Sequence, residues 1–143
     1  MSRYTYSFEK LEVWQLSRKL VQEIYSLTDG FPNEEKYGMV SQIRRAAVSI
    51  TCNIAEGAGR KTGKDKAHFT QMAFSSLLEV LNLLIVAVDL RFMEEKALEA
   101  IRPTIEHIGN KLNALRNAQL KQGINNKAVH SPMVSETNKQ IPK

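Results

Sequence analysis

The chain has 143 residues, of which 43% are hydrophobic, and this predicts one soluble domain with a substantial core. A net charge of +5 and a pI near 9.4 permit nucleic-acid binding but do not require it. The single cysteine, Cys52, excludes an internal disulfide and fits a reducing cytoplasm.

Neither a signal peptide nor a membrane span is indicated by the sequence. The N-terminal residues, MSRYTYSFEK, contain no apolar signal region. The longest nearly apolar run, residues 77–88, is interrupted by Glu79 and Asn82 and is too short to span a bilayer. We therefore expect a cytoplasmic protein without membrane contact.

The basic charge is unevenly distributed along the chain. Residues 1–110 hold 14 basic and 14 acidic residues, whereas residues 111–143 hold six basic residues and one acidic residue. Within the balanced part, residues 42–66 are locally basic, with two acidic side chains against Arg44, Arg45, Arg60, Lys61, Lys64 and Lys66. This segment is therefore the first candidate for a phosphate-binding surface.

The first two segments with helical periodicity precede this basic turn. Residues 8–27 form the first, with Ser7 as a candidate N-cap and Gly30 at its end. Residues 34–58 form the second, with Asn33 as a candidate cap. The second carries a coiled-coil-like apolar seam, and its many small residues, "RAAVSITCNIAEGAG", indicate an additional contact surface.

The third and fourth segments follow the turn. Residues 63–90 are apolar almost all round, which predicts a central helix or one buried again in an oligomer, and Thr62 and Asp65 have capping-box spacing. Residues 94–122 form the fourth, in which Pro103 predicts a kink or division. No segment has the pattern of a strand. The sequence therefore predicts an all-α fold, an antiparallel up-down-up-down four-helix bundle.

The expected domain organisation has three parts. Residues 1–7 form an N-terminal extension and residues 8–122 the four-helix bundle. Gly123 is a natural helix stop, and residues 123–143 are polar, contain two prolines and lack periodicity. We therefore expect residues 123–143 to be a disordered polar tail.

Phosphate-loop, metal and nucleophile motifs are not supported. In the glycine-rich turn, Asp65 follows Gly63-Lys64 where a P-loop needs Ser or Thr, and the preceding segment is a predicted helix. The histidines are scattered through the sequence and Cys52 is alone, so no pair has zinc-like spacing. No G-x-S-x-G turn presents a nucleophile. We expect no cofactor and no metal.

One weak nuclease pattern is present in the fourth segment. Arg102 and His107, in "RPTIEH", fit the R-x(4–6)-H spacing of helical HEPN ribonucleases, in which Arg would stabilise phosphate and His would transfer a proton. The pattern is short, and Pro103 occupies a position that is polar in such enzymes. A solvated helix face is the favoured interpretation, so we expect no enzyme and keep a ribonuclease as a lesser alternative.

Two groups of polar residues, one on the second and third segments and one in the turn between them, can each be interpreted in more than one way. Asn53, Glu56 and Glu79 fit packing or ion pairs between helices or subunits better than catalysis. The four basic residues of the turn can neutralise phosphates without reading sequence, although no aromatic except the predicted core residue Phe69 lies among them. A solvated turn is the alternative for this basic group, and both interpretations stay open.

Three pieces of the sequence match a known family: "FEKLEVWQ", "FPNEEKYGMVSQIRRAAVSITCNIAEGAGR" and the E-x-x-x-L-L pattern beginning at Glu79. They closely resemble the 23S rRNA intervening-sequence protein family, the S23-type four-helix bundles. The resemblance extends over about residues 8–120 and implies a ring, typically a homopentamer, with no established catalytic activity. Some genes of the family lie within 23S rRNA genes. A similar bundle, the accessory variability determinant of diversity-generating retroelements, is a basic pentamer that binds a reverse transcriptase and nucleic acid.

Taken together, residues and resemblance predict a non-enzymatic oligomer that binds RNA or DNA electrostatically, as an accessory to a reverse transcriptase or an rRNA-related process. The predicted phosphate contacts are Arg44, Arg45, Arg60, Lys61, Lys64 and Lys66. The alternative is a purely structural ring without affinity for nucleic acid.

Overall fold

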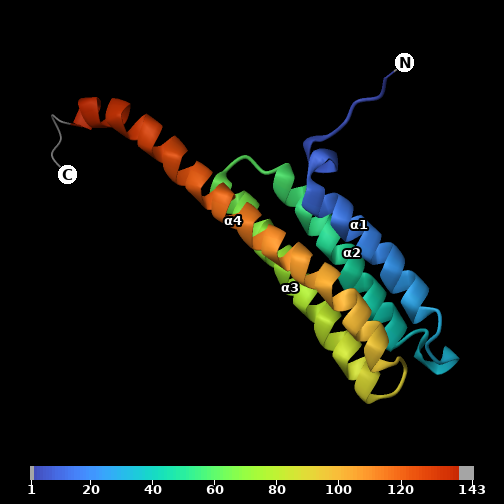
Figure 1. Cartoon of the computed structure of the whole chain (residues 1–143). Helices are drawn as coiled ribbons and strands as arrows, with labels where there is room; N and C mark the ends of the chain where they lie inside the picture. Colours follow the sequence, from blue (N-terminus) through green and yellow to red (C-terminus); the bar gives the residue numbers. More distant parts are fainter. Residues whose placement is uncertain (1, 139–143) are drawn as a thin grey trace.

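The chain is all-helical over the residues described. The computed structural model describes the backbone of residues 2–138 and the side chains of residues 2–122. In this part of the chain there is no strand, and the predicted all-α class with four long helices is confirmed. The elements, shown in Figure 1, are η1 (Ser7–Lys10), α1 (Glu12–Thr28), η2 (Asn33–Glu35), α2 (Met39–Ala58), α3 (Gly63–Asp89) and α4 (Glu95–Asn138).

The first two helices begin later than the sequence predicts. Leu11 is extended (φ −72°, ψ 124°) and separates η1 from α1, so Ser7 opens the short helix and does not cap α1. Asn33 likewise opens η2, and α2 begins only after Gly38. The carboxylate of Glu35 accepts a hydrogen bond from the Met39 N–H at 3.2 Å, which satisfies one free donor at the start of α2.

The third helix begins where its cap predicts. The Thr62 hydroxyl accepts a hydrogen bond from the Asp65 N–H at 3.1 Å, as the N-cap spacing requires. By length and composition alone, α3 could cross a membrane, because its 27 residues extend well beyond the run 77–88 that the sequence analysis judged too short. Here α3 packs against both α2 and α4, and a core helix of a bundle meets the same test.

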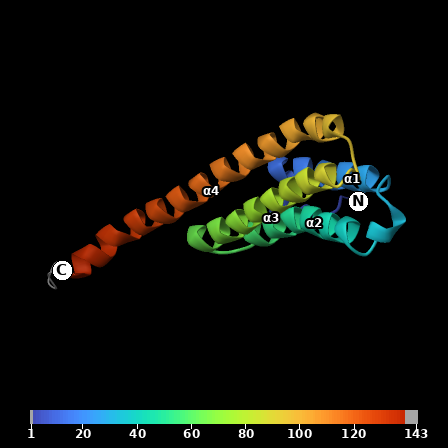
Figure 2. The ribbon, with the colours of Figure 1, turned by 90° about the horizontal axis from the view of Figure 1, so that it is seen from below.

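The fourth helix is not divided at Pro103, where the sequence predicts a kink or a division. Pro103 lies inside α4 without dividing it, because the helix packs on the core on both sides of the proline through Leu98, Ile101 and Ile105. The helix also continues past Gly123, where we expected it to end, and projects beyond the other helices (Figures 1 and 2). Of the expected tail, residues 123–138 are helical here, and residues 139–143 lie outside the described residues.

Consecutive helices lie side by side around one core. α1 packs on α2, α2 on α3 and α3 on α4, and α4 also contacts α1 (Figures 1 and 2). Apolar side chains at helical spacing fill the interior, including Leu20, Ile43, Ile50, Leu84 and Ile108. The long apolar seams therefore position the turns and helix ends, where the charged residues gather.

The two ends of the bundle are closed by different residues. At one end the rings of Phe31 and Phe92 lie 5.8 Å apart and join the α1–α2 and α3–α4 connections. At the other end Ser7, Lys66 and Leu115 line a small cleft of about 240 Å³ between η1, the start of α3 and α4. The basic turn between α2 and α3 lies at this second end.

Candidate nucleic-acid interface

The six predicted phosphate contacts do not form one surface. Arg44 and Arg45 lie near the start of α2, whereas the other four lie in the α2–α3 turn and the start of α3. Fifteen residues of mostly helical chain separate Arg45 from Arg60, roughly 20 Å along the axis at about 1.5 Å per residue. The structure therefore divides them into two groups at different places along the bundle.

The larger group occupies the end of the bundle that holds the α2–α3 turn. Arg60, Lys61 and Lys64 are exposed there, and Lys66 is half-buried. The stretch of α4 that lines the neighbouring cleft adds two further cations to this end, which were absent from the sequence prediction. We call this region the basic end: Arg60, Lys61, Lys64, Lys66, Arg116 and Lys121, which outnumber the exposed Glu56 and Asp65 of the same turn.

An aromatic ring lies within the basic end. The Arg60 guanidinium stacks 5.1 Å from the ring centre of Phe69, which is half-buried instead of fully in the core as predicted. Arg116 is half-buried as well, and its Nε has no hydrogen-bond partner among the residues described. Cations held on apolar surface in this way keep their charge while losing part of their conformational freedom.

The opposite end of the bundle is acidic. Its two connections and the flanking helical turns carry Lys36, Arg91 and Lys96, and Arg44 extends to the same end and pairs with Asp29. Against these four cations there are seven acidic residues, Asp29, Glu34, Glu35, Asp89, Glu94, Glu95 and Glu99. The bundle therefore has a charge separation along its length. Such a separation concentrates positive potential at the basic end. The net charge of the chain does not reveal where that potential lies.

Arg44 is used for packing between α2 and α1. Its guanidinium donates to the Thr28 hydroxyl (2.9 Å), the Tyr25 carbonyl (3.2 Å) and the Asp29 carboxylate (3.0 Å). It also lies 4.3 Å from the ring centre of Tyr25. Because the helix dipole places partial negative charge at the C-terminus of α1, a cation in this position stabilises it. Most of the donor capacity of Arg44 is therefore already occupied.

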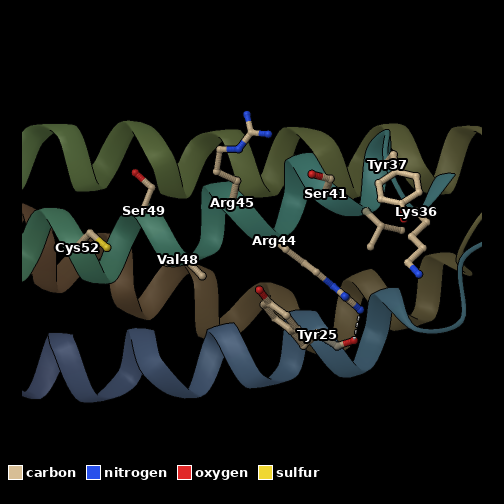
Figure 3. A pocket seen from close by; sticks show the side chains of 10 residues that line it. Tyr25, Lys36, Tyr37, Ser41, Arg44, Arg45, Val48, Ser49 and Cys52 are labelled. Carbon is tan, nitrogen blue, oxygen red and sulfur yellow. Dashed lines mark hydrogen bonds between the residues drawn. The ribbon is translucent and has the colours of Figure 1, made fainter.

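Arg45 instead lines a groove on the outer face of α2. Figure 3 shows the lining side chains over α2, with Tyr25 of α1 on one side. The groove has a volume of about 650 Å³. Tyr25, Lys36 and Tyr37 contribute to its walls, and Cys52, an exposed free thiol, lies at the other end. Neither tyrosine was predicted as a site residue, because only the folded chain brings Tyr25 of α1 and Tyr37, in the turn before α2, to one concave surface.

The three polar residues assigned to packing have different environments. Asn53 is buried, and its amide donates to the carbonyl (3.0 Å) and hydroxyl (3.1 Å) of Ser49, whose hydroxyl shares a hydrogen bond with Ser76 of α3 (3.0 Å). Glu56 and Glu79 are exposed and make no ion pair with the side chains of residues 2–122. Their role at an interface between subunits stays a prediction.

The nuclease pair is not brought together. Arg102 and His107 are both exposed on α4, and five residues of α-helix place them about 140° apart around its axis. Among the residues described, no group of three or more His, Cys, Asp and Glu side chains could hold a metal ion. His130 lies outside the described side chains.

A charged contact between α1 and α4 lies beside His107. The Lys111 ammonium pairs with the carboxylate of Glu12 in the first turn of α1. The hydrogen bond and charge of Lys111, assisted by the charge of His107, hold the pKa of Glu12 below its usual range. A carboxylate in a first helical turn also suits the helix dipole, so the ionised form is favoured in the folded chain.

Replacing Lys111 with methionine is expected to raise the pKa of Glu12 toward its ordinary value, measured by NMR titration of its side-chain carboxyl. Because the folded pKa is lowered, the pair stabilises the fold above the unfolded-state pKa and loses this effect as pH falls through the folded pKa. Acidification through that range should therefore lower the thermal midpoint more in the wild type than in Lys111→Met. Lys121→Met is the control on the same helix. An unchanged Glu12 titration in Lys111→Met would contradict the assignment.

Comparison with known proteins identifies the family of this chain. The sequence profile of the 23S rRNA-intervening sequence protein family matches residues 9–114. A crystal structure from Bacteroides thetaiotaomicron, a protein of unknown function from the S23 ribosomal protein family, is similar with a TM-score of 0.67 and 23% identity. The similarity covers 73% of this chain and 97% of that chain, and it shows a shared fold alone. No curated protein matches this chain.

Proposed function

This chain belongs to the 23S rRNA-intervening sequence protein family, and from that premise we propose that it is a non-enzymatic bundle that binds RNA or DNA through its basic end. The observation that carries the proposal is the charge separation along the bundle. Six cations lie at one end against Glu56 and Asp65. Lys61 and Lys64, both exposed, make no ion pair with the side chains described. Lysine and arginine so placed neutralise phosphates without reading base sequence.

The proposal extends to the assembly. We infer an antiparallel up-down-up-down bundle that forms a homopentameric ring, supported by apolar side chains that the single chain leaves exposed on α3, namely Met72, Leu78 and Ile85. A ring would repeat the basic end once per subunit around one rim and multiply its field. The proposed setting is an accessory role to a reverse transcriptase, as in diversity-generating retroelements, or to an rRNA-related process.

The same exposed side chains favour a second candidate, a structural ring that has no affinity for nucleic acid. The two candidates differ in one measurable property. Both predict the same particle mass without RNA, but only the first predicts that the mass increases when mixed-sequence RNA is added. Mass measurement in solution with and without RNA separates them.

Reversing two charges at the basic end should weaken binding. In Lys61→Glu/Lys64→Glu, we expect the affinity for a labelled mixed-sequence RNA to fall at least about tenfold at low salt. The slope of log K against log salt should become shallower by about 0.7 for each phosphate of single-stranded RNA that the variant no longer neutralises. Both side chains are exposed, so the fold should be retained.

The matched control is Lys96→Glu at the acidic end of the bundle, which should leave affinity and slope nearly unchanged. Fluorescence anisotropy over a salt series gives both quantities. Wild-type protein that shows no binding even at low salt would contradict the proposal and leave the structural ring.

A further inference from the structure

The groove on the outer face of α2 is separate from the basic end and has its own chemistry. Its volume of about 650 Å³ is within the range of roughly 300–1,000 Å³ that holds small ligands. Val40 and Val48 supply apolar surface, and Ser41 and Ser49 supply hydroxyl groups. An apolar surface bordered by a few polar groups is suited to a flat, partly apolar ligand.

Two cations at the groove are available for an anion. Arg45 is exposed, and it has no hydrogen bond or ion pair with the side chains of residues 2–122. Lys36 also has no carboxylate within ion-pair distance in that part of the chain, and its ammonium lies 5.6 Å from the ring centre of Tyr37. Arg44, held by Thr28 and Asp29, adds positive charge without being free to move.

Two aromatic rings border the same groove. Tyr37 is 88% exposed and Tyr25 is 42% exposed, so both rings are accessible to a ligand. Figure 3 shows Tyr25 beside Arg44 and Tyr37 beside Lys36, with Arg45 farther along α2. Aromatic rings interleaved with free cations are the combination on which single-stranded nucleic acids bind, with bases stacking on rings and phosphates meeting cations.

We propose that this groove binds one or two nucleotides of a single-stranded RNA or DNA, with a base stacked on Tyr37 and successive phosphates bound by Lys36 and by Arg45. This inference rests on the proposed function and adds a second contact site and a substrate class to it. Bases of a duplex are stacked within the helix and cannot reach a tyrosine ring, whereas bases of a single strand can be splayed out. The groove therefore confers a preference for single strands that the basic end does not.

The first test compares a labelled twelve-nucleotide oligouridylate with a labelled duplex of equal length. Wild-type protein should bind the single strand more tightly, and Tyr37→Ala should weaken that binding about tenfold, as expected for loss of one stacked base. Binding of the duplex should change less than twofold. Tyr37→Phe keeps the ring and should keep the affinity, which makes it the matched control.

The second test locates the bound strand through the one cysteine. Cys52 is exposed and lines the groove, so its rate of alkylation reports whether the groove is occupied. Saturating oligouridylate should slow alkylation severalfold in the wild type and not in Arg45→Gln/Tyr37→Ala. Lys61→Glu/Lys64→Glu, tested at an oligonucleotide concentration that saturates it, should retain the protection.

The outcomes separate this inference from the proposed function. Absence of binding to both oligonucleotides at low salt would overturn both. Binding with unchanged affinity in Tyr37→Ala, or without protection of Cys52, would overturn the groove alone and leave the basic end. Slow alkylation of Cys52 before any oligonucleotide is added would show that another copy of the chain covers the groove, and would also overturn the inference.

Discussion

Gly57→Ala is expected to destabilise the protein by about 1–3 kcal/mol, because a methyl group has no room between α2 and α3. A Cβ at this position would lie 2.8 Å from the Cβ of Phe69 and 3.3 Å from the carbonyl oxygen of Lys66. Neither atom can rotate away, since both are fixed to the α3 backbone. The two helices must therefore move apart, which loosens the packing of the side chains around Gly57.

The steric effect outweighs the gain in helix propensity. Alanine in a helix interior is favoured over glycine by roughly 0.5–1 kcal/mol, which opposes the clash without cancelling it. The movement should also disturb the basic end, because Phe69 carries the stacked guanidinium of Arg60. Weaker RNA binding is thus expected to accompany the loss of stability.

Gly59→Ala is the matched control, two residues away. A Cβ there meets only the Glu56 carbonyl, at an ordinary 3.6 Å, so the stability should change by no more than about 0.5 kcal/mol. Urea denaturation of the three proteins gives the comparison through their midpoints and slopes. Equal stability of Gly57→Ala and Gly59→Ala would show that α2 and α3 do not approach as closely as described.

Thr70→Val is expected to destabilise the protein by about 1–3 kcal/mol, because it leaves a buried acceptor without its donor. The Thr70 hydroxyl donates to Oε1 of Gln119 at 2.7 Å, and the two residues are 2% and 7% exposed. Valine has nearly the same shape as threonine, so the loss is mainly that of the hydrogen bond. This bond joins α3 to α4 close to Lys66, whose carbonyl lies 3.1 Å from the same hydroxyl.

A double replacement tests the assignment. Thr70→Val/Gln119→Leu removes both partners, and we expect it to be more stable than the sum of the single effects by about 0.5–3 kcal/mol, the range for coupled neighbours. Thr51→Val is the control, since its hydroxyl bonds only to the Val48 carbonyl within its own helix on the exposed side. Chemical denaturation measures all four variants. Additive single effects would mean that the two side chains do not interact.

Local patterns in the sequence were sufficient to predict the four long helices and one helix cap. The three-and-four spacing of the seams in α2 and α4 predicts which faces are buried, because an apolar stripe must be removed from water wherever its partner lies. Thr62 is bonded to Asp65 as its spacing predicts, since the contact spans only one turn. The starts of α1 and α2 were less predictable, because Ser7 and Asn33 open separate short helices.

The candidate site was only partly predictable. Residues 42–66 were identified as basic from composition, but their division into a basic end and a groove depends on the distance along α2. Arg44 was predicted to contact phosphate. Its partners in the structure are Thr28 and Asp29 at the end of α1, which lie 16 and 15 positions earlier in the chain. No periodicity within either helix indicates such a contact.

The sequence by itself determined the all-helical class, the four long helices and the basic turn, because these follow from interactions within a few residues of one another. Only the tertiary structure decided that Gly57 is the point where α2 meets α3, that Arg116 and Lys121 of α4 extend the basic turn, and that Tyr25 and Tyr37 border the groove of Arg45. Each of these depends on which helix faces lie against each other. That choice is set by the packing of the whole core, which no single segment encodes.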